Sequence, residues 1–517
     1  MAVHSPQLTP RDVARALDAA SIMGESAAEA QATRAEKARS QVSAEIPIKA
    51  QTGGHLVDGQ PAAPPEAIDL TQHVLGAGGR GVSGFTGPDQ PSDEILQKCI
   101  RCGFCLPTCP TYLETYSEAS SPRGRIRLIQ AVADGELSLT DSGFVEQMYQ
   151  CLDCRACEAV CPSGVRYGQL VEAARTQIER ARPRPVGQRA LRSAIFGGLF
   201  ADRRRFRLAG RALRLYQRSG ARRLARQSGA LDVLGLRATE ALAPDAPDQF
   251  YTPHDEVYAA PPDGPQRGRV ALFAGCVMSS IFAGTDRATI RVLNANGFTV
   301  VAPAAQECCG ALTIHAGEMD RARTLAARNI EAFEASGTAY IISNAAGCGS
   351  ALKEYGQLFA DFPAWRERAE AFAARVRDIT ELLGDALARG ELSTRFEPLP
   401  MTVTYQEPCH LAHAQRITRQ PRALLAAIPG LRVVEMVESS LCCGSAGVYN
   451  ITRPEMAGAL GRRKAGHIVA TRAQAVVTAN PGCALQLRSQ LQQMGSDMPV
   501  LHIVDLLDAA YRGRMPL

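Results

Sequence analysis

The sequence predicts a multidomain protein of the α+β and α/β classes, in which a small helical domain precedes a duplicated α/β domain with parallel strands. The helical part is predicted by residues 99–109 and 151–161, which each carry four cysteines at nearly the same spacing, with a helical stretch between them. The α/β part is predicted by short β-branched segments that alternate with helical stretches in the second half. Because the order of these segments occurs twice, we expect a duplication.

These features divide the 517 residues into five predicted segments, since a chain of this length is too long for one compact domain. They are an N-terminal helix with a poorly patterned stretch (1–91), the helical cysteine domain (92–180), a basic helical segment with a proline-rich linker (181–265), and the two copies of the repeat (266–396 and 397–517). The sixteen cysteines lie in three of the five segments.

The composition is that of an ordinary globular protein, with 46% hydrophobic and 21% charged residues. The net charge of +5 is too small to indicate nucleic-acid binding. No apolar run is long enough to span a bilayer, and the N-terminus lacks the pattern of a secretory signal, so we expect a cytoplasmic protein. Cysteines are reduced in that compartment, which favours metal ligation over disulfides.

The first 91 residues carry little core-forming pattern. Thr9 and Asp12 resemble a helix cap, and apolar residues follow at helical spacing as far as Ile22, which predicts a short amphipathic helix. From Gly24 to Pro91, alanine, glycine, glutamine and proline occur without periodicity. We expect a mobile segment there that contributes little to a core.

The two cysteine runs, CIRCGFCLPTCP and CLDCRACEAVCP, have the spacing C-x2-C-x2-C-x3-C-P of bacterial ferredoxins. In this pattern three close thiolates hold one [4Fe-4S] cluster, and the fourth cysteine ligates the other cluster. One predicted set is Cys99, Cys102, Cys105 and Cys161. The other predicted set is Cys109, Cys151, Cys154 and Cys157. Zinc also binds paired C-x2-C thiolates, but it does not need a fourth cysteine before proline in both runs, so we expect iron–sulfur clusters.

The second half contains an internal repeat of three strand-like segments, each followed by cysteine. One copy has RVALFAGC, FTVVAPAAQECCG and AYIISNAAGCG, and the other has MTVTYQEPCH, LRVVEMVESSLCCG and AVVTANPGC. Because open parallel sheets bind ligands beyond the carboxyl ends of their strands, we expect the four thiols of each copy to converge. The two sets are Cys276, Cys308, Cys309 and Cys348, and Cys409, Cys442, Cys443 and Cys483.

Each copy has two adjacent cysteines followed by glycine. Adjacent side chains in an extended loop point in different directions, so they bind two metals of one cluster or need a turn to converge on one metal. Gly310 and Gly444 permit such a turn and let backbone amides approach sulfur. Soft thiolates suit both iron–sulfur clusters and zinc, and both remain open at this point.

Three histidines near these cysteines, His315, His410 and His413, are candidates for metal ligands or proton carriers. We interpret them instead as surface or hydrogen-bonded helix histidines. No flavin or nicotinamide motif is evident, so the chain lacks an obvious hydride acceptor. We therefore assign no catalytic residue.

Residues 203–226 contain ten arginines and no acidic residue, which predicts a basic amphipathic helix or a pair of helices. One interpretation is a solvated face whose arginine stems cover apolar surface. The other, which we favour, is a surface that docks an acidic partner subunit or anionic lipid headgroups and includes Arg203, Arg204 and Arg205.

The motifs together resemble a known family. The repeat is similar to the cysteine-rich CCG domains of heterodisulfide reductases, anaerobic glycerol-3-phosphate dehydrogenase, lactate-utilisation proteins and glycolate oxidase. With SPRGRIRLI, CPSGVRYG, GCGSALKEYGQ, LCCGSAG and VTANPGC, residues 92–517 most closely resemble the iron–sulfur subunit of glycolate oxidase. Cys348 and Cys483 lack the C-x2-C ending of many CCG repeats, so each copy offers four thiols rather than five. This departure weakens the noncubane catalytic cluster that a likeness to heterodisulfide reductase would imply.

The resemblance implies an electron relay within an oxidoreductase complex. In this family a separate FAD-containing subunit oxidises a 2-hydroxy acid, glycolate to glyoxylate, and the iron–sulfur subunit passes electrons toward a quinone or another acceptor. The resemblance also favours iron–sulfur clusters over zinc in the CCG copies. Peripheral contact with the inner face of the cell membrane is an expectation from the basic segment 203–226. The alternatives are a heterodisulfide-reductase-like catalytic subunit, an iron–sulfur subunit for lactate or glycerol-3-phosphate oxidation, and a structural zinc role for the CCG half.

Overall fold

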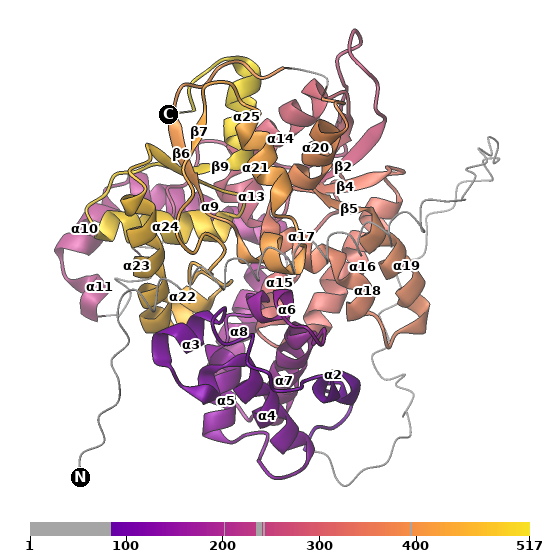
Figure 1. Ribbon diagram of the computed structural model, residues 1–517, viewed down its shortest axis with the longest axis vertical. Coiled ribbons are helices and arrows are strands. Elements are labelled where there is room, and N and C mark those ends of the chain that lie inside the picture. The colour runs from indigo at the N-terminus through magenta and orange to yellow at the C-terminus, as the bar shows by residue number, and fades with distance from the viewer. Residues whose placement is uncertain (1–83, 201, 234–239, 241–242, 393–394, 517) are drawn as a thin grey trace, which may run out of the picture. The chain divides into compact units, whose positions relative to one another are not determined.

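The computed structural model describes residues 84–200, 202–233, 240, 243–392 and 395–516. They form a helical cysteine domain, a helical linker and two sheets flanked by helices (Figure 1). The predicted class, helices followed by a duplicated α/β unit with parallel strands, is confirmed. The predicted N-terminal helix lies outside the described residues.

Short helices build the domain that carries the two cysteine runs. They are α2 (Asp93–Gln97), α3 (Pro110–Thr115), the 3-10 helix η1 (Glu118–Ser120), α4 (Pro122–Ala133), α5 (Ser142–Gln150), α6 (Ala156–Ala159) and α7 (Tyr167–Ala181). Helix α4 begins at Pro122, as the sequence predicts, because the Ser121 hydroxyl accepts the Gly124 N–H and proline has no N–H to satisfy. Ile129 and Leu170 are fully buried between these helices.

The end of the N-terminal segment belongs to this domain, although we expected little core before Pro91. Phe85 is buried, and its ring centroid lies 6.5 Å from that of Phe144. Asp89 forms an ion pair with Arg180 at 2.7 Å and a second one with Arg323. One aromatic anchor and one charged anchor therefore hold this end of the segment, and neither produces a periodic pattern in the sequence.

The linker is helical and confirms the predicted pair of basic helices. Its elements are α8 (Val186–Arg192), the π-helix η2 (Ser193–Leu199), α9 (Arg203–Arg218), α10 (Ala221–Gln227) and α11 (Ala230–Val233). The Asp202 carboxylate caps α9 by accepting the N–H of Arg204 at 2.7 Å. The expectation that Arg203 contributes to docking is wrong, because its guanidinium is buried and donates to the Gln306 carbonyl at 3.0 Å.

The two copies of the repeat form two sheets of matching topology. The strands are β1 (Val257–Tyr258), β2 (Arg269–Phe273), β3 (Thr299–Val301), β4 (Tyr340–Ser343), β5 (Val376–Asp378), β6 (Thr402–Tyr405), β7 (Arg432–Val433), β8 (Ala475–Thr478) and β9 (Val500–His502). The first sheet has the order β1-β3-β2-β4-β5 and the second β7-β6-β8-β9. All strand pairs are parallel except β1 with β3, so the predicted parallel arrangement is confirmed. Strand β1 comes from the proline-rich linker, and the first sheet therefore begins before residue 266.

Helices connect the strands and join the two copies. The first copy has α13 (Val277–Ile281), α14 (Ala283–Ala295), α15 (Ala311–His315), α16 (Met319–Glu334), α17 (Ala346–Lys353), α18 (Tyr355–Leu358), α19 (Pro363–Arg375) and α20 (Ile379–Ala388). The second has the π-helix η3 (His410–Ala414), α21 (Arg419–Ala426), α22 (Tyr449–Thr452), α23 (Pro454–Ala470), α24 (Pro481–Gln493) and α25 (Ile503–Arg512). Helix α14 packs on α25 and α20 packs on α21, so the early helix of each copy meets the last helix of the other. Buried side chains of both copies, such as Leu272 and Val403, share one core.

Candidate metal centres

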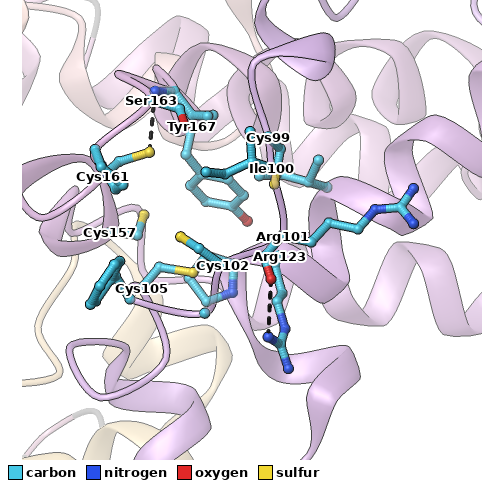
Figure 2. Close-up of a pocket in the computed structure, with 16 residues that line it drawn as sticks. Cys99, Ile100, Arg101, Cys102, Cys105, Arg123, Cys157, Cys161, Ser163 and Tyr167 are labelled. Carbon is cyan, nitrogen blue, oxygen red and sulfur yellow. Dashed lines mark hydrogen bonds between the residues drawn. The ribbon is translucent and has the colours of Figure 1, made fainter.

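The four thiols of the first predicted set, with Cys157 beside them, line one space (Figure 2) that reaches solvent at Cys102. Three come from the loop between α2 and α3, where Arg101 and Gly103 have φ of 57° and 88° and curl the backbone. Cys102 is exposed and the other three are half-buried. They are Cys99, Cys102, Cys105 and Cys161. The structure therefore brings together the set that the ferredoxin pattern predicts, including the crossing cysteine from the second run.

The other predicted set lines a second space, and all four of its cysteines are buried. They are Cys109, Cys151, Cys154 and Cys157. Asp153 and Arg155 have φ of 53° and 60°, and this curl turns the Asp153 N–H toward the Cys151 sulfur at 3.3 Å. Pro122, Cys157 and Tyr167 border both spaces, so the two sites are immediate neighbours.

The donor set of the second space fits an iron–sulfur cluster. Burial raises the pKa of the Cys154 and Cys157 thiols well above their usual value, because an ionised sulfur loses its hydration there. Four thiolates in such a space need positive charge, which the irons of a cluster supply. Buried Arg125 adds to it next to Cys109 and Cys151, where it also donates to the Gln147 carbonyl at 2.8 Å.

In the first copy of the repeat, the four predicted thiols meet beyond the ends of β2, β3 and β4. The sulfurs of Cys276 and Cys308 are 3.6 Å apart, and the neighbouring thiols of Cys308 and Cys348 raise the pKa of Cys309 well above its usual value. The hydrogen bond from Cys276 holds the pKa of Cys308 well below its usual value, and the Gly310 N–H acts in the same direction. Backbone amides do approach sulfur here, as expected from the glycine.

The second copy repeats this arrangement beyond β6, β7 and β8. The sulfurs of Cys409 and Cys442 are 3.9 Å apart, and the neighbouring thiols of Cys442 and Cys483 hold the pKa of Cys443 well below its usual value. Cys483 lies in the first turn of α24, as Cys348 does in α17. The last cysteine of each copy therefore lies at the positive end of a helix dipole.

Each repeat site has a buried basic side chain near its thiols. Lys464 is buried beside the thiols of the second copy and donates to the Ser439 carbonyl at 3.2 Å. Burial lowers the pKa of its ammonium group. In the first copy, buried Arg203 acts electrostatically on Cys276. Positive charge therefore offsets thiolate charge in both copies.

Gly444 and Gly310 provide a matched test of the turn after each cysteine pair. Their φ values are 87° and 83°, so alanine at either position costs about 1–2 kcal/mol of backbone energy. A Cβ at Gly444 would lie 2.6 Å from the Ala457 carbonyl oxygen, whereas the nearest atom at Gly310 is the Ala322 Cα at 3.5 Å. We therefore expect Gly444→Ala to lower the thermal unfolding midpoint more than Gly310→Ala. Equal midpoints would contradict the difference in packing.

The four thiol groups form a connected series. Cys154 of the helical domain packs in one apolar cluster with Cys442 of the second copy. From the second copy, the Asn480 amide donates to the Cys483 sulfur at 3.5 Å and accepts the Gly347 N–H at 3.1 Å, next to Cys348 of the first copy. The order of the series is therefore solvent-facing space, buried space, second copy and first copy.

A buried ion network centred on Arg155 ties the helical domain to both copies. The guanidinium lies 2.8 Å from carboxylate oxygens of Asp153 and Glu172 and 3.3 Å from one of Glu354 in the first copy. His410 of the second copy hydrogen-bonds to the Asp153 carbonyl at 3.0 Å. Our sequence reasoning missed Arg155, although both it and Asp153 lie between cysteines of the motif CLDCRAC.

The three histidines are hydrogen-bonded, as we interpreted them, but they are not surface residues. His315 Nδ1 lies 3.0 Å from an Asp153 carboxylate oxygen, and His413 Nε2 lies 3.1 Å from the Ser440 carbonyl. Burial lowers the pKa of His410 to about 4, so its ring is neutral at physiological pH. All three therefore make hydrogen bonds in the surroundings of the thiol groups.

Two cysteine-lined spaces in a helical domain, joined to duplicated sheets with converging thiols, define an iron–sulfur protein of the dicluster and CCG class. Family models agree with this class. The 4Fe-4S dicluster domain matches residues 95–165, and the cysteine-rich CCG domain matches residues 270–353 and 403–488. The linker region of the glycolate oxidase iron-sulfur subunit matches residues 187–243.

The chain belongs to the family of glycolate oxidase iron–sulfur subunits. It is 43% identical to the probable glycolate oxidase iron-sulfur subunit of Bacillus subtilis (strain 168), over 80% of this chain and 93% of that protein. It is 32% identical to the glycolate oxidase iron-sulfur subunit of Escherichia coli (strain K12), over 77% and 91% of the two chains. It is also 29% identical to a subunit of the fumarate reductase (CoM/CoB) of Methanothermobacter marburgensis, over 84% and 76%. The resemblance stated from the motifs is confirmed.

Proposed function

We propose that the chain is the electron-relay subunit of a glycolate oxidase (glycolate dehydrogenase) complex. Its partner is an FAD-containing subunit that oxidises glycolate or a related 2-hydroxy acid, and its acceptor is a quinone or another oxidant. The observation that carries the proposal is the connected series of four thiol groups, together with the family membership. Iron–sulfur clusters, when bound there, supply one-electron redox chemistry.

We assign all sixteen cysteines as ligands of this series. In the helical domain they hold two [4Fe-4S] clusters, and in the two copies they hold further iron–sulfur clusters, with zinc as the alternative metal. The ligands in the helical domain are Cys99, Cys102, Cys105, Cys109, Cys151, Cys154, Cys157 and Cys161. The ligands in the repeat are Cys276, Cys308, Cys309, Cys348, Cys409, Cys442, Cys443 and Cys483.

The remaining residues of the series position and shield the thiols. Cys102 is exposed whereas the second space is buried, so a redox partner outside the chain exchanges electrons on the Cys102 side. The apolar contact of Leu152, Cys154 and Cys442 excludes water between the helical domain and the second copy. Arg125 and Lys464 offset the negative charge of buried thiolates at these two sites.

The relay is tested with Cys157→Ser in a complex reconstituted with the flavoprotein partner. Cys157 borders both spaces of the helical domain, so the variant should lose iron and most of its electron transfer to an external acceptor dye. Reduction of the flavin by glycolate should be unchanged, because that step needs no group of this chain. Thr140→Ala, at an exposed site of the same domain, is the control and should behave as wild type.

Failure of glycolate to reduce the flavin in the Cys157→Ser complex would contradict the relay. It would place part of the oxidation chemistry on this chain. The heterodisulfide-reductase-like alternative makes a separate demand, namely turnover of a disulfide substrate by this chain without the flavoprotein. The relay requires that the isolated chain shows none.

A further inference from the structure

The exposed face of α9 carries an apolar row beside a basic row. Leu208 and Leu215 lie seven residues apart, and their exposed fractions are 65% and 69%. Arg204 and Arg211 have the same spacing and are also exposed, so they form a parallel row on the neighbouring part of the helix surface. Both rows face solvent, since the opposite side of α9 packs through buried Gly210.

Several arginines on this pair of helices are not neutralised within the part of the chain that the structure describes. Arg204, Arg211 and Arg223 have no ion pair among the described residues. The paired arginines use acids from outside residues 203–226, namely Asp202, Glu240, Asp245 and Asp248. On α10, Leu224 is 69% exposed and adjacent to Arg223, so an exposed leucine again lies beside an exposed arginine.

We propose that α9 and α10 bind the surface of an anionic lipid bilayer. With 16 residues α9 is about 24 Å long, and it lies flat with its leucines in the headgroup boundary and its arginines on lipid phosphates. No helix among the described residues has the length and apolar character needed to cross a bilayer, so the contact is peripheral.

The charges and the spacing favour lipid over an acidic protein as the occupant. A basic face without any acidic residue of its own complements a surface of uniform negative charge. Leucines spread two turns apart along the helix suit a fluid apolar layer, whereas a protein anchor normally gathers its apolar side chains into one patch. The purpose of this contact rests on the proposed function, because a quinone acceptor resides in the membrane.

The test is cosedimentation of the complete, iron-loaded chain with vesicles. We expect binding to vesicles that contain phosphatidylglycerol and phosphatidylcholine, none to phosphatidylcholine alone, and release at high salt. Absence of binding to the anionic vesicles would overturn the proposal. The assay needs no electron transfer, so vesicle binding can be absent while the electron relay is intact, and vesicle binding can be present while the relay is absent.

Matched variants separate a specific face from general positive charge. Arg204→Gln with Arg211→Gln should weaken binding about 25-fold, at about fivefold for each arginine near the surface. Leu208→Ser with Leu215→Ser should weaken it about tenfold or more. Arg366→Gln with Arg389→Gln removes the same charge from exposed sites on other elements and should change binding by less than about twofold. Equal losses of vesicle binding in the two arginine double variants would overturn the proposal. It would also be overturned if the α9 variants bound vesicles as wild type does but no longer bound the partner subunit.

Discussion

Cys109→Ser and Cys161→Ser are expected to remove different clusters. Cys109→Ser should remove the cluster held mainly by the second run of cysteines, and Cys161→Ser the cluster held mainly by the first run. Cys109 lines the buried space with Cys151 and Cys154, and Cys161 lines the solvent-facing space with Cys102. Each variant should lose about four iron atoms relative to wild type, because each removes one ligand of one cubane. Electron transfer to an external acceptor should fall to near background in both.

Double variants decide whether the cysteines cross. Cys102→Ser with Cys161→Ser should lose about four iron atoms, the same as either single variant, because both residues serve one cluster. Cys102→Ser with Cys109→Ser should lose about eight, because the two residues serve different clusters. The reverse result would show that each run holds its own cluster. Iron content and the paramagnetic signal of the reduced protein provide the two measurements.

The grouping of the thiols could be predicted from the sequence because it depends on local spacing and on strand direction. The position of Cys161 beside Cys99 follows from the ferredoxin spacing alone, and the meeting of Cys276 with Cys348 follows from their places after parallel strands. Gly310 also marks its turn directly, since few other residues adopt a φ of 83° without strain. In each case, a short local stretch of sequence is enough to predict where the cysteine or glycine lies.

The charged surroundings of the thiols could not be predicted, because they depend on contacts between distant residues. Arg155 meets Glu354, 199 positions further along the chain, and no local pattern links the two. Lys464 lies on a helix among other basic residues, and only the fold buries it. The same reason explains the error at Arg203, whose neighbours Arg204 and Arg205 are exposed as expected.

The largest loss of stability is expected from Arg155→Met, because this change takes the guanidinium away from two buried carboxylates. Asp153 is fully buried and Glu172 nearly so, and removing one partner of a buried ion pair costs about 3–5 kcal/mol. The matched control is Arg127→Met, which breaks a pair with Glu136 whose side chains are 47% and 57% exposed. That exposed pair contributes about 1 kcal/mol or less.

Chemical denaturation of the iron-loaded chain should therefore show a much lower midpoint for Arg155→Met than for Arg127→Met. Limited proteolysis provides a second measurement. Arg155 pairs with Glu354 of the first copy, and the carbonyl of its neighbour Asp153 bonds to His410 of the second copy. Arg155→Met should therefore expose cleavage sites between the helical domain and both copies of the repeat. Equal midpoints for the two variants would mean that the buried network does not hold the domains together. In that case other contacts would have to do so, such as the apolar contacts around Cys154 and Cys442 and the hydrogen bond from the Tyr449 hydroxyl to the Gln150 carbonyl.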